Sequence, residues 1–269
     1  MKFRIFETTT YRTVFIAVAI LSFCLTAGAQ NDEEADGDNG QWRIDSSTTI
    51  VRLPRNFRVF MPTPANPDCP EMNLSASGQY TPTEMRAVVD SLRHLAKGDI
   101  WLVDLRQESH FFKDGLAVSW YCDHNWGNRG KDNSACEEDE QKRMLAAHGT
   151  SERQMADSLG VKYLRIRATD HLCPEDSLID VFADFVRSLS ADDWVHIHCA
   201  AGKGRTGVML AVYEAIKNPT ATLDEILQRQ RRMGASDLYS KVQKTKDAEN
   251  RARQMPRIFK RVRKSKRSE

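Results

Sequence analysis

The sequence of 269 residues predicts an α/β fold in which helices flank a central, mostly parallel sheet. Apolar runs of strand length lie at 100–105 and 194–197, and residues 161–166 alternate between apolar and polar side chains as a half-buried strand does. Residues 174–189 instead place their apolar side chains on one face of a helix. Strands that alternate with helices along a chain are typical of a layered parallel sheet.

Further elements complete this pattern. Thr81-Pro82-Thr83-Glu84 has the spacing of a helix N-terminus, in which threonine caps the helix and glutamate bonds back to it, so a helix is expected over 81–97. Prolines punctuate residues 54–70, which are therefore expected to form a loop. More helices are expected over 137–147, 151–159, 205–217 and 223–233, with a last one from about residue 237.

The first 29 residues have the organisation of a secretory signal peptide. Lys2, Arg4 and Arg12 precede an apolar run over 14–25, and Ala27-Gly28-Ala29 follows as a small-x-small cleavage site. Cleavage after Ala29 predicts a periplasmic or secreted protein. The apolar run is short for a membrane span, and no later segment is apolar enough to form one.

The segments near the two ends differ in charge. Residues 30–47 are acidic and glycine-rich, which predicts a disordered leader. Residues 251–269 form a basic C-terminal tail, with nine Lys or Arg and no acid over 251–267. Such a tail can contact anionic surfaces, or it can be a solvated last helix whose positive end complements its own dipole. Because nothing else favours it, nucleic-acid binding is not expected.

The most informative segment is His198–Gly207, directly after the predicted strand at 194–197. A cysteine at a strand end, five loop residues and an arginine at a helix start form a cradle for phosphate, because backbone N–H groups and the helix N-terminus converge there. The same field favours the thiolate form of Cys199 and makes it a nucleophile. The planar guanidinium of Arg205 can hold two phosphate oxygens. The loop residues between them are Ala200, Ala201, Gly202, Lys203 and Gly204.

Three side chains near this loop have more specific interpretations. Lys203 indicates a substrate with several phosphates, or it is a surface lysine that points into water. Asp170 follows the strand at 161–166 and is the best candidate to protonate the leaving alkoxide; near a bound phosphate dianion its pKa should be raised. The alternative for Asp170 is a helix cap or a turn. The Thr206 hydroxyl can hydrogen-bond the thiolate and ease breakdown of a phosphocysteine.

Five cysteines remain after the expected cleavage. With Cys199 as nucleophile, the other four allow up to two disulfides in an oxidising compartment, and their pairing is open. Cys173 can alternatively switch Cys199 off by oxidation, or simply be buried. No Cys or His cluster has zinc spacing, so neither a metal nor another cofactor is expected. The four remaining cysteines are Cys69, Cys122, Cys136 and Cys173.

The segment Cys199–Arg205 resembles the signature of the protein tyrosine phosphatase superfamily. More narrowly, the chain resembles the bacterial protein-tyrosine-phosphatase-like phytases, which are cysteine-dependent inositol hexakisphosphate phosphatases. The likeness runs from about residue 50 to 240. Besides the phosphate loop, its segments are Asn56-Phe57-Arg58, Asp104–His110, Val118–Tyr121, Asn125-Trp126, Ala168–His171, Lys217–Pro219 and Ile226–Gln230.

The resemblance implies a phosphatase-like layered fold, with a cysteine phosphatase domain over residues 48–250. It also implies that Arg58 contacts a second phosphate of an inositol ring, and that Glu108 and His171 line the pocket beside Asp170. Family members carry a partial β-barrel after the Asn-Trp loop. Here only residues 127–160 fill that place and their pattern is helical, so the insert is expected to be reduced or absent.

The expected function is hydrolysis of myo-inositol hexakisphosphate and lower inositol polyphosphates through a phosphocysteine intermediate. The runner-up is a protein-tyrosine or phosphoinositide phosphatase that acts on extracellular or host substrates. A third class is a catalytically idle phosphate-binding module. The presence of a residue at every catalytic position counts against this last hypothesis.

Overall fold

The computed structural model describes residues 42–64, 66–120, 141–142, 144–239 and 245–264. Five strands form its main sheet, in the order β2-β3-β8-β4-β7. The last four are parallel to one another, and only the short β2 is antiparallel to its neighbour. The expected mostly parallel α/β sheet is therefore confirmed. The strands are β2 Arg58–Val59, β3 Leu74–Ser77, β4 Ile100–Arg106, β7 Lys162–Ala168 and β8 Trp194–His198.

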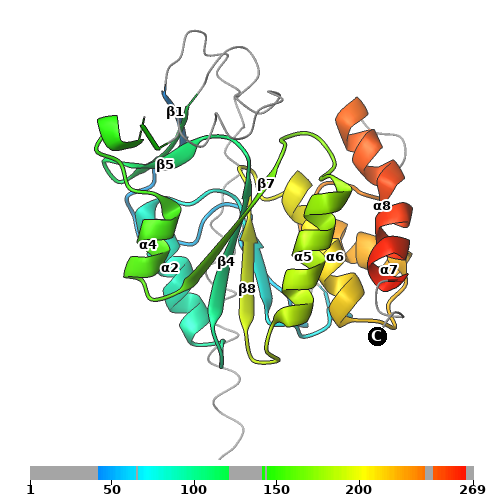
Figure 1. Ribbon diagram of the computed structural model, residues 1–269. Coiled ribbons are helices and arrows are strands. Elements are labelled where there is room, and N and C mark those ends of the chain that lie inside the picture. The colour runs from blue at the N-terminus through cyan, green and yellow to red at the C-terminus, as the bar shows by residue number, and fades with distance from the viewer. Residues whose placement is uncertain (1–41, 65, 121–140, 143, 240–244, 265–269) are drawn as a thin grey trace, which may run out of the picture. The chain divides into compact units, whose positions relative to one another are not determined.

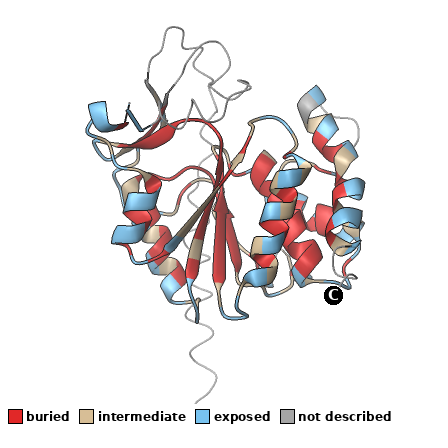
Figure 2. Ribbon diagram, viewed as in Figure 1, coloured by how far each residue is buried: buried red, intermediate tan, exposed pale blue. Residues whose placement is uncertain are grey.

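Helices cover both faces of this sheet (Figure 1). α2 and α4 lie on one face; α5 and α6 lie on the other, and α7 and α8 pack against α6. β3, β4 and β8 are almost entirely buried between the two helical layers, whereas β7, at the edge of the sheet, is mostly half-buried (Figure 2). The helices are α2 Pro82–Arg93, α4 Glu152–Ser158, α5 Asp176–Ser188, α6 Gly204–Lys217, α7 Leu223–Arg232 and α8 Lys246–Lys264.

Local sequence explains where these helices begin. Thr81 caps α2 and accepts from the backbone of Glu84, whose carboxylate accepts from the Thr81 N–H, so the predicted capping box is confirmed. α5 buries Ile179, Phe182 and Val186 on one face, as the periodicity predicts. α6 is buried along nearly its whole length because helices and sheet surround it.

A second, three-stranded antiparallel sheet has the order β1-β6-β5. Asp114 and Gly115 both have left-handed backbone angles, φ 51° and 78°, and connect β5 to β6 as a tight hairpin. The described strands form no closed barrel. The strands are β1 Trp42–Ser46, β5 His110–Lys113 and β6 Leu116–Trp120.

β1 corrects one prediction, because residues 42–46 were expected to belong to a disordered leader. They pair with β6, so that part of the acidic segment is ordered by backbone hydrogen bonds. The proline-rich segment also differs from the expected loop, since it contains β2. Residues 1–41, with the expected signal peptide and most of the leader, lie outside the described residues.

The last helix begins later than expected. The Asp237 carboxylate accepts from the Tyr239 N–H and closes a local turn there, while the Thr245 hydroxyl accepts from the Ala248 N–H at the start of α8. The expected boundary between domain and tail, at residue 251, therefore falls inside α8. Of the helix expected over 137–147, residues 141–142 and 144–146 are helical, and residues 121–140 lie outside the description. In the described part of the chain, no helix has the length and apolar character needed to cross a membrane.

Candidate active site

The topology brings the predicted catalytic residues to one edge of the main sheet. β4, β7 and β8 are parallel, so their carboxyl ends, at Arg106, Ala168 and His198, lie at the same edge. The loops that follow carry Glu108, Asp170 and Cys199. Ligands bind at this edge in open α/β sheets because several loops converge there.

Hydrogen bonds to its backbone carbonyl groups hold the phosphate loop, residues 199–205, in place. Side chains of the 55–58 segment donate to three of these oxygens: Arg55 to Ala200, Asn56 to Ala201 and Arg58 to Gly202, each at 2.8 Å. The backbone N–H of Gln79 donates to Ala200 as well, at 2.9 Å. Since the N–H and C=O of a trans peptide point in opposite directions, carbonyls bound on the outside leave the loop N–H groups for an anion inside.

Gly202 is the tightest point of this loop. Its φ is +73°, and a Cβ there would lie 2.4 Å from the carbonyl carbon and oxygen of Ser77. Its N–H donates to the Cys199 sulfur at 3.2 Å. Glycine is therefore required both by the backbone angle and by the lack of space, and its N–H lies against the nucleophile.

Cys199 itself is buried, with 3 % of its surface exposed. The Arg58 guanidinium lies close by, and both of its terminal nitrogens donate to backbone carbonyls, of Asn56 and Gly202. Burial lowers the pKa of Arg58 to about 10, while the Cys199 sulfur acts in the opposite direction. Arg58 thus supports the loop, and its contact with a second phosphate stays a prediction.

Arg205 is fixed by a two-pronged ion pair. Its Nη1 donates to Glu108 Oε2 at 2.6 Å, and its Nη2 donates to Glu108 Oε1 at 2.9 Å. Nη1 also donates to the Ala168 carbonyl at 3.1 Å. Among the described residues, the buried Nε has no hydrogen-bond partner. That nitrogen remains as a donor for a phosphate oxygen.

Glu108 is held in turn by Arg106, whose Nε donates to Glu108 Oε1 at 2.7 Å. Burial alone would raise the pKa of Glu108, but Arg205 and Arg106 hold it well below its ordinary value. The Glu108 carboxylate is therefore ionised in the folded protein at neutral pH. Its position fits support of Arg205 rather than proton transfer.

Asp170 faces Arg205 from the loop after β7. Its Oδ1 lies 3.1 Å from Arg205 Nη2 and also accepts from the His171 N–H at 2.9 Å. The Asp170 side chain is 25 % exposed, and that of His171 is 52 % exposed. His171 has a left-handed backbone, with φ +60°. The acid is thus placed beside the arginine and remains reachable from solvent.

Thr206 and Lys203 differ in burial. Thr206 is fully buried, and within the described ranges its hydroxyl has no hydrogen-bond partner, so it is available to the thiolate. Lys203 is exposed at the end of the loop. Both of the roles predicted for these residues stay predictions.

Behind the loop lies a buried charged cluster that sequence reasoning did not identify. It consists of Asp104, His110, Glu152 and His198, with His198 Nε2 3.0 Å from Glu152 Oε2 and His110 Nε2 3.2 Å from Asp104 Oδ2. Burial tends to lower the pKa of His110, but Asp104 raises it to about 9. Gln79 connects the cluster to the loop, because its side chain donates to Glu152 and its backbone N–H donates to Ala200.

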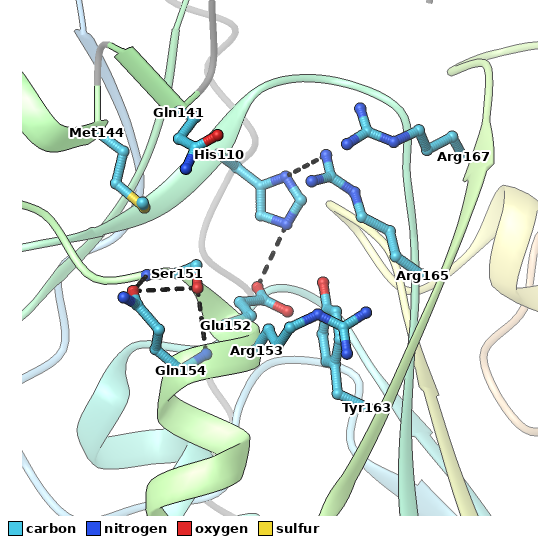
Figure 3. A pocket seen from close by; sticks show the side chains of 10 residues that line it. All are labelled: His110, Gln141, Met144, Ser151, Glu152, Arg153, Gln154, Tyr163, Arg165 and Arg167. Carbon is cyan, nitrogen blue, oxygen red and sulfur yellow. Dashed lines mark hydrogen bonds and ion pairs between the residues drawn. The ribbon is translucent and has the colours of Figure 1, made fainter. Parts of the chain in front are cut away.

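A cavity of about 440 Å³ adjoins this cluster on the side of β7 and α4 (Figure 3). Its wall includes His110 and Glu152 together with Arg153, Arg165 and Arg167, but neither Cys199 nor Asp170 lines it. Arg165 donates to the carbonyls of Arg106 and Glu108, so one wall of the cavity supports the loop that carries Glu108. The reaction centre is therefore defined by the geometry of the phosphate loop, not by this cavity.

Cys69, Cys173 and Cys199 are free cysteines in the structure, so the disulfides that the sequence left possible for the first two are not formed. Burial raises the pKa of Cys69 and of Cys173 to about 11. Both side chains are therefore thiols at neutral pH and slow to attack a disulfide or an oxidant. Cys122 and Cys136 lie outside the described residues.

The site joins a cysteine in a phosphate-binding loop to an arginine that a glutamate orients, with an aspartate on the opposite side. This arrangement is that of a protein-tyrosine-phosphatase-like domain. A family model agrees with this class: the model of the PTP-like phytases, with the description "Inositol hexakisphosphate", matches residues 147–217. By this model and by the solved structures below, the chain is similar to the PTP-like phytases.

Three solved structures, from two organisms, have the same fold. The tandemly repeated PTP-like phytase of Mitsuokella multacida is 31 % identical, with a TM-score of 0.74 over 85 % of this chain and 47 % of that one. The same values hold for the Mitsuokella PTP-like myo-inositol phosphatase in complex with myo-inositol-(1,3,4,5)-tetrakisphosphate. A PTP-like phytase of Bdellovibrio bacteriovorus is 26 % identical, with a TM-score of 0.69 over 84 % of this chain and 90 % of that one.

A curated relative is the effector protein hopD2 of Pseudomonas syringae pv. tomato, which is 25 % identical over 154 residues. That match covers 46 % of this chain and 33 % of hopD2. The chain therefore spans a third of hopD2 and about half of the Mitsuokella protein.

Proposed function

We propose that this protein hydrolyses phosphate monoesters of inositol polyphosphates, myo-inositol hexakisphosphate among them, through a phosphocysteine intermediate. The observation that carries the proposal is the position of Arg205 between Glu108 and Asp170, beside the loop that holds Cys199. One guanidinium is thereby oriented toward the reaction centre, and one carboxyl group lies beside it as a proton donor.

In the first step, the Cys199 thiolate attacks phosphorus. The S–P bond forms while the bond from phosphorus to the ester oxygen breaks, and the leaving oxygen takes the electron pair. Asp170 gives its proton to that oxygen, so that an alcohol leaves instead of an alkoxide. The loop N–H groups and Arg205 hold the equatorial oxygens on which charge accumulates.

In the second step, water attacks the phosphocysteine. Asp170, now ionised, takes a proton from this water, the O–P bond forms and the S–P bond breaks. The thiolate of Cys199 leaves with the electron pair, and inorganic phosphate is released. The Thr206 hydroxyl can donate to the departing sulfur, since it is buried without another partner in the described residues.

Two observations support a polyphosphorylated substrate. Lys203 adds an exposed positive charge to the phosphate loop, where a neighbouring phosphate of a crowded ring would lie. A relative with 31 % identity has been solved with an inositol tetrakisphosphate. The alternative substrate classes are phosphotyrosyl proteins and phosphoinositides, which carry fewer or more widely spaced phosphates.

A side-by-side measurement of phosphate release separates these classes. The substrates are inositol hexakisphosphate, a phosphotyrosyl peptide and a phosphoinositide, with Cys199→Ser as the inactive control. The proposal expects the highest kcat/KM for inositol hexakisphosphate. A large preference for the peptide or the lipid would overturn the substrate class, and activity that survives Cys199→Ser would overturn the mechanism.

The same proposal includes a periplasmic or secreted location, supported by the signal-peptide pattern of residues 1–29. Expression of the full chain in a bacterial host, followed by N-terminal sequencing of the protein in the periplasm and medium, tests it. A mature N-terminus at Gln30 is expected. Full-length protein confined to the cytoplasm would contradict this location.

A further inference from the structure

The basic C-terminal segment is an integral layer of the domain. α8 buries Ala252, and its Met255, Ile258 and Val262 belong to the core that α5 and α6 share. Its outer arginines pair across to α5, Arg257 with Asp176 and Arg261 with Asp180. α8 is thus held against α5, which follows the general-acid loop (residues 169–175), and is packed on α6, which follows the phosphate loop.

The first turns of α8 place one arginine between these loops. Arg251 is 8 % exposed, and its Nη1 donates to the carbonyl oxygen of His171, the residue after Asp170. The same guanidinium lies beside Gly204, since a Cβ added to that residue would be 3.5 Å from Cζ and Nη2 of Arg251. A single side chain therefore hydrogen-bonds the loop that carries Asp170 and lies next to the phosphate loop.

The general-acid loop needs such a contact. His171 has φ +60°, a left-handed conformation that is unfavourable for a residue with a side chain and persists only where the surroundings hold it. The Asp170 carboxylate accepts from the N–H of this same residue. A change of backbone at His171 would therefore move the acid away from Arg205.

We propose that Arg251 is a positioning residue that fixes the general-acid loop over the phosphate loop, so that α8 is required for proton transfer to the leaving group. The inference rests on the proposed phosphatase activity. Arg251 acts through its hydrogen bond to the His171 carbonyl, beside Gly204 of the phosphate loop.

Leaving-group chemistry tests this role, because a general acid matters only when the departing oxygen is basic. In the intact protein, 4-nitrophenyl phosphate has a good leaving group, whereas phenyl phosphate and inositol hexakisphosphate have poor ones. Asp170→Asn defines the pattern expected when the acid is lost. Arg253→Ala is the matched control, since Arg253 lies on the same helix, is exposed and pairs with Glu249.

Arg251→Ala is expected to lower kcat/KM, which reports the step in which the leaving group departs, about 10- to 100-fold with phenyl phosphate and inositol hexakisphosphate and less than about 3-fold with 4-nitrophenyl phosphate. The larger loss lies at or below the lower end of the roughly 100- to 10,000-fold effect of general acid catalysis, because the acid itself is still present. KM for phenyl phosphate and inositol hexakisphosphate should change little. Arg251→Lys, which keeps one donor, should recover part of the rate, and Arg253→Ala should behave as the unmodified protein.

Other outcomes overturn the inference. Equal losses of kcat/KM with all three substrates would show that Arg251 only supports the fold, which a thermal unfolding measurement on the same samples would also register. A raised KM with unchanged kcat would make Arg251 a substrate contact. If the unmodified protein hydrolyses none of these esters, the proposed function fails; if it hydrolyses them and Arg251→Ala has no effect, only the role of Arg251 fails.

Discussion

Both terminal nitrogens of Arg205 donate to the carboxylate of Glu108, at 2.6 and 2.9 Å, in the interior of the protein. This pairing decides which edge of the guanidinium remains for phosphate, because it takes one N–H of each terminal nitrogen, while the Nε N–H has no partner among the described residues. The arginine is thereby oriented before substrate arrives. Such preorganisation is a main source of rate in phosphoryl transfer.

Glu108→Gln removes the charge but keeps the size of the side chain. We expect kcat/KM to fall about 10- to 100-fold, because charge-assisted hydrogen bonds contribute roughly 1.5–3 kcal/mol. Steady-state kinetics with inositol hexakisphosphate, below the unfolding temperature of the variant, measures this effect.

The matched control is Glu249→Gln, which removes the carboxylate of a partly exposed pair with Arg253. Its activity should stay within about 2-fold of the original, since exposed ion pairs contribute little. Equal effects of the two substitutions would contradict the orienting role of Glu108.

Gly202→Ala tests the geometry of the loop. The new Cβ would meet the Ser77 carbonyl at 2.4 Å, so the loop must shift. Because displacements of about 1 Å at a reaction centre cost on the order of 100-fold, we expect at least a tenfold loss of kcat. Gly160→Ala is the control: φ is also positive, +65°, but nothing lies within 4 Å of its Cβ. A fully active Gly202→Ala variant would be incompatible with the tight loop.

The fold, and the position of the candidate catalytic residues at one edge of the sheet, were predictable because their signals are local. Strand, loop and helix are contiguous around Cys199. Asp170 follows β7, the strand that precedes β8 in the chain. The helix cap at Thr81 and Glu84 likewise depends on neighbours in sequence. The resemblance to a known family then restricted the fold further.

Contacts between distant segments were not predictable in this way. β1 is strand only because it pairs with β6, more than 70 residues later in the chain. Glu152 and Arg251 lie on helix surfaces in the sequence pattern, where a charged residue ordinarily faces water. Only the packing of α4 and α8 places them against the phosphate loop and its neighbours.

The protonation of His110 predicts how the free energy of unfolding depends on pH. Its pKa, near 6.5 when unfolded and about 9 when folded, means that the folded state holds the proton more tightly. The resulting stabilisation is complete below pH 6.5 and is lost as pH rises toward 9, which amounts to a few kcal/mol at about 1.4 kcal/mol per pKa unit. Chemical denaturation at a series of pH values should show this decline, and His110→Gln should flatten it. An imidazole that titrates near 6.5 by NMR would refute the predicted charge cluster.

The phosphocysteine is the central claim, and rapid acid quenching followed by peptide mass spectrometry tests it directly. With inositol hexakisphosphate as substrate, the peptide that contains Cys199 is expected to carry one phosphate during turnover and to lose it once substrate is exhausted. Cys199→Ser should abolish turnover. Steady hydrolysis by the unmodified protein with no phosphate on that peptide at any quench time would contradict the mechanism.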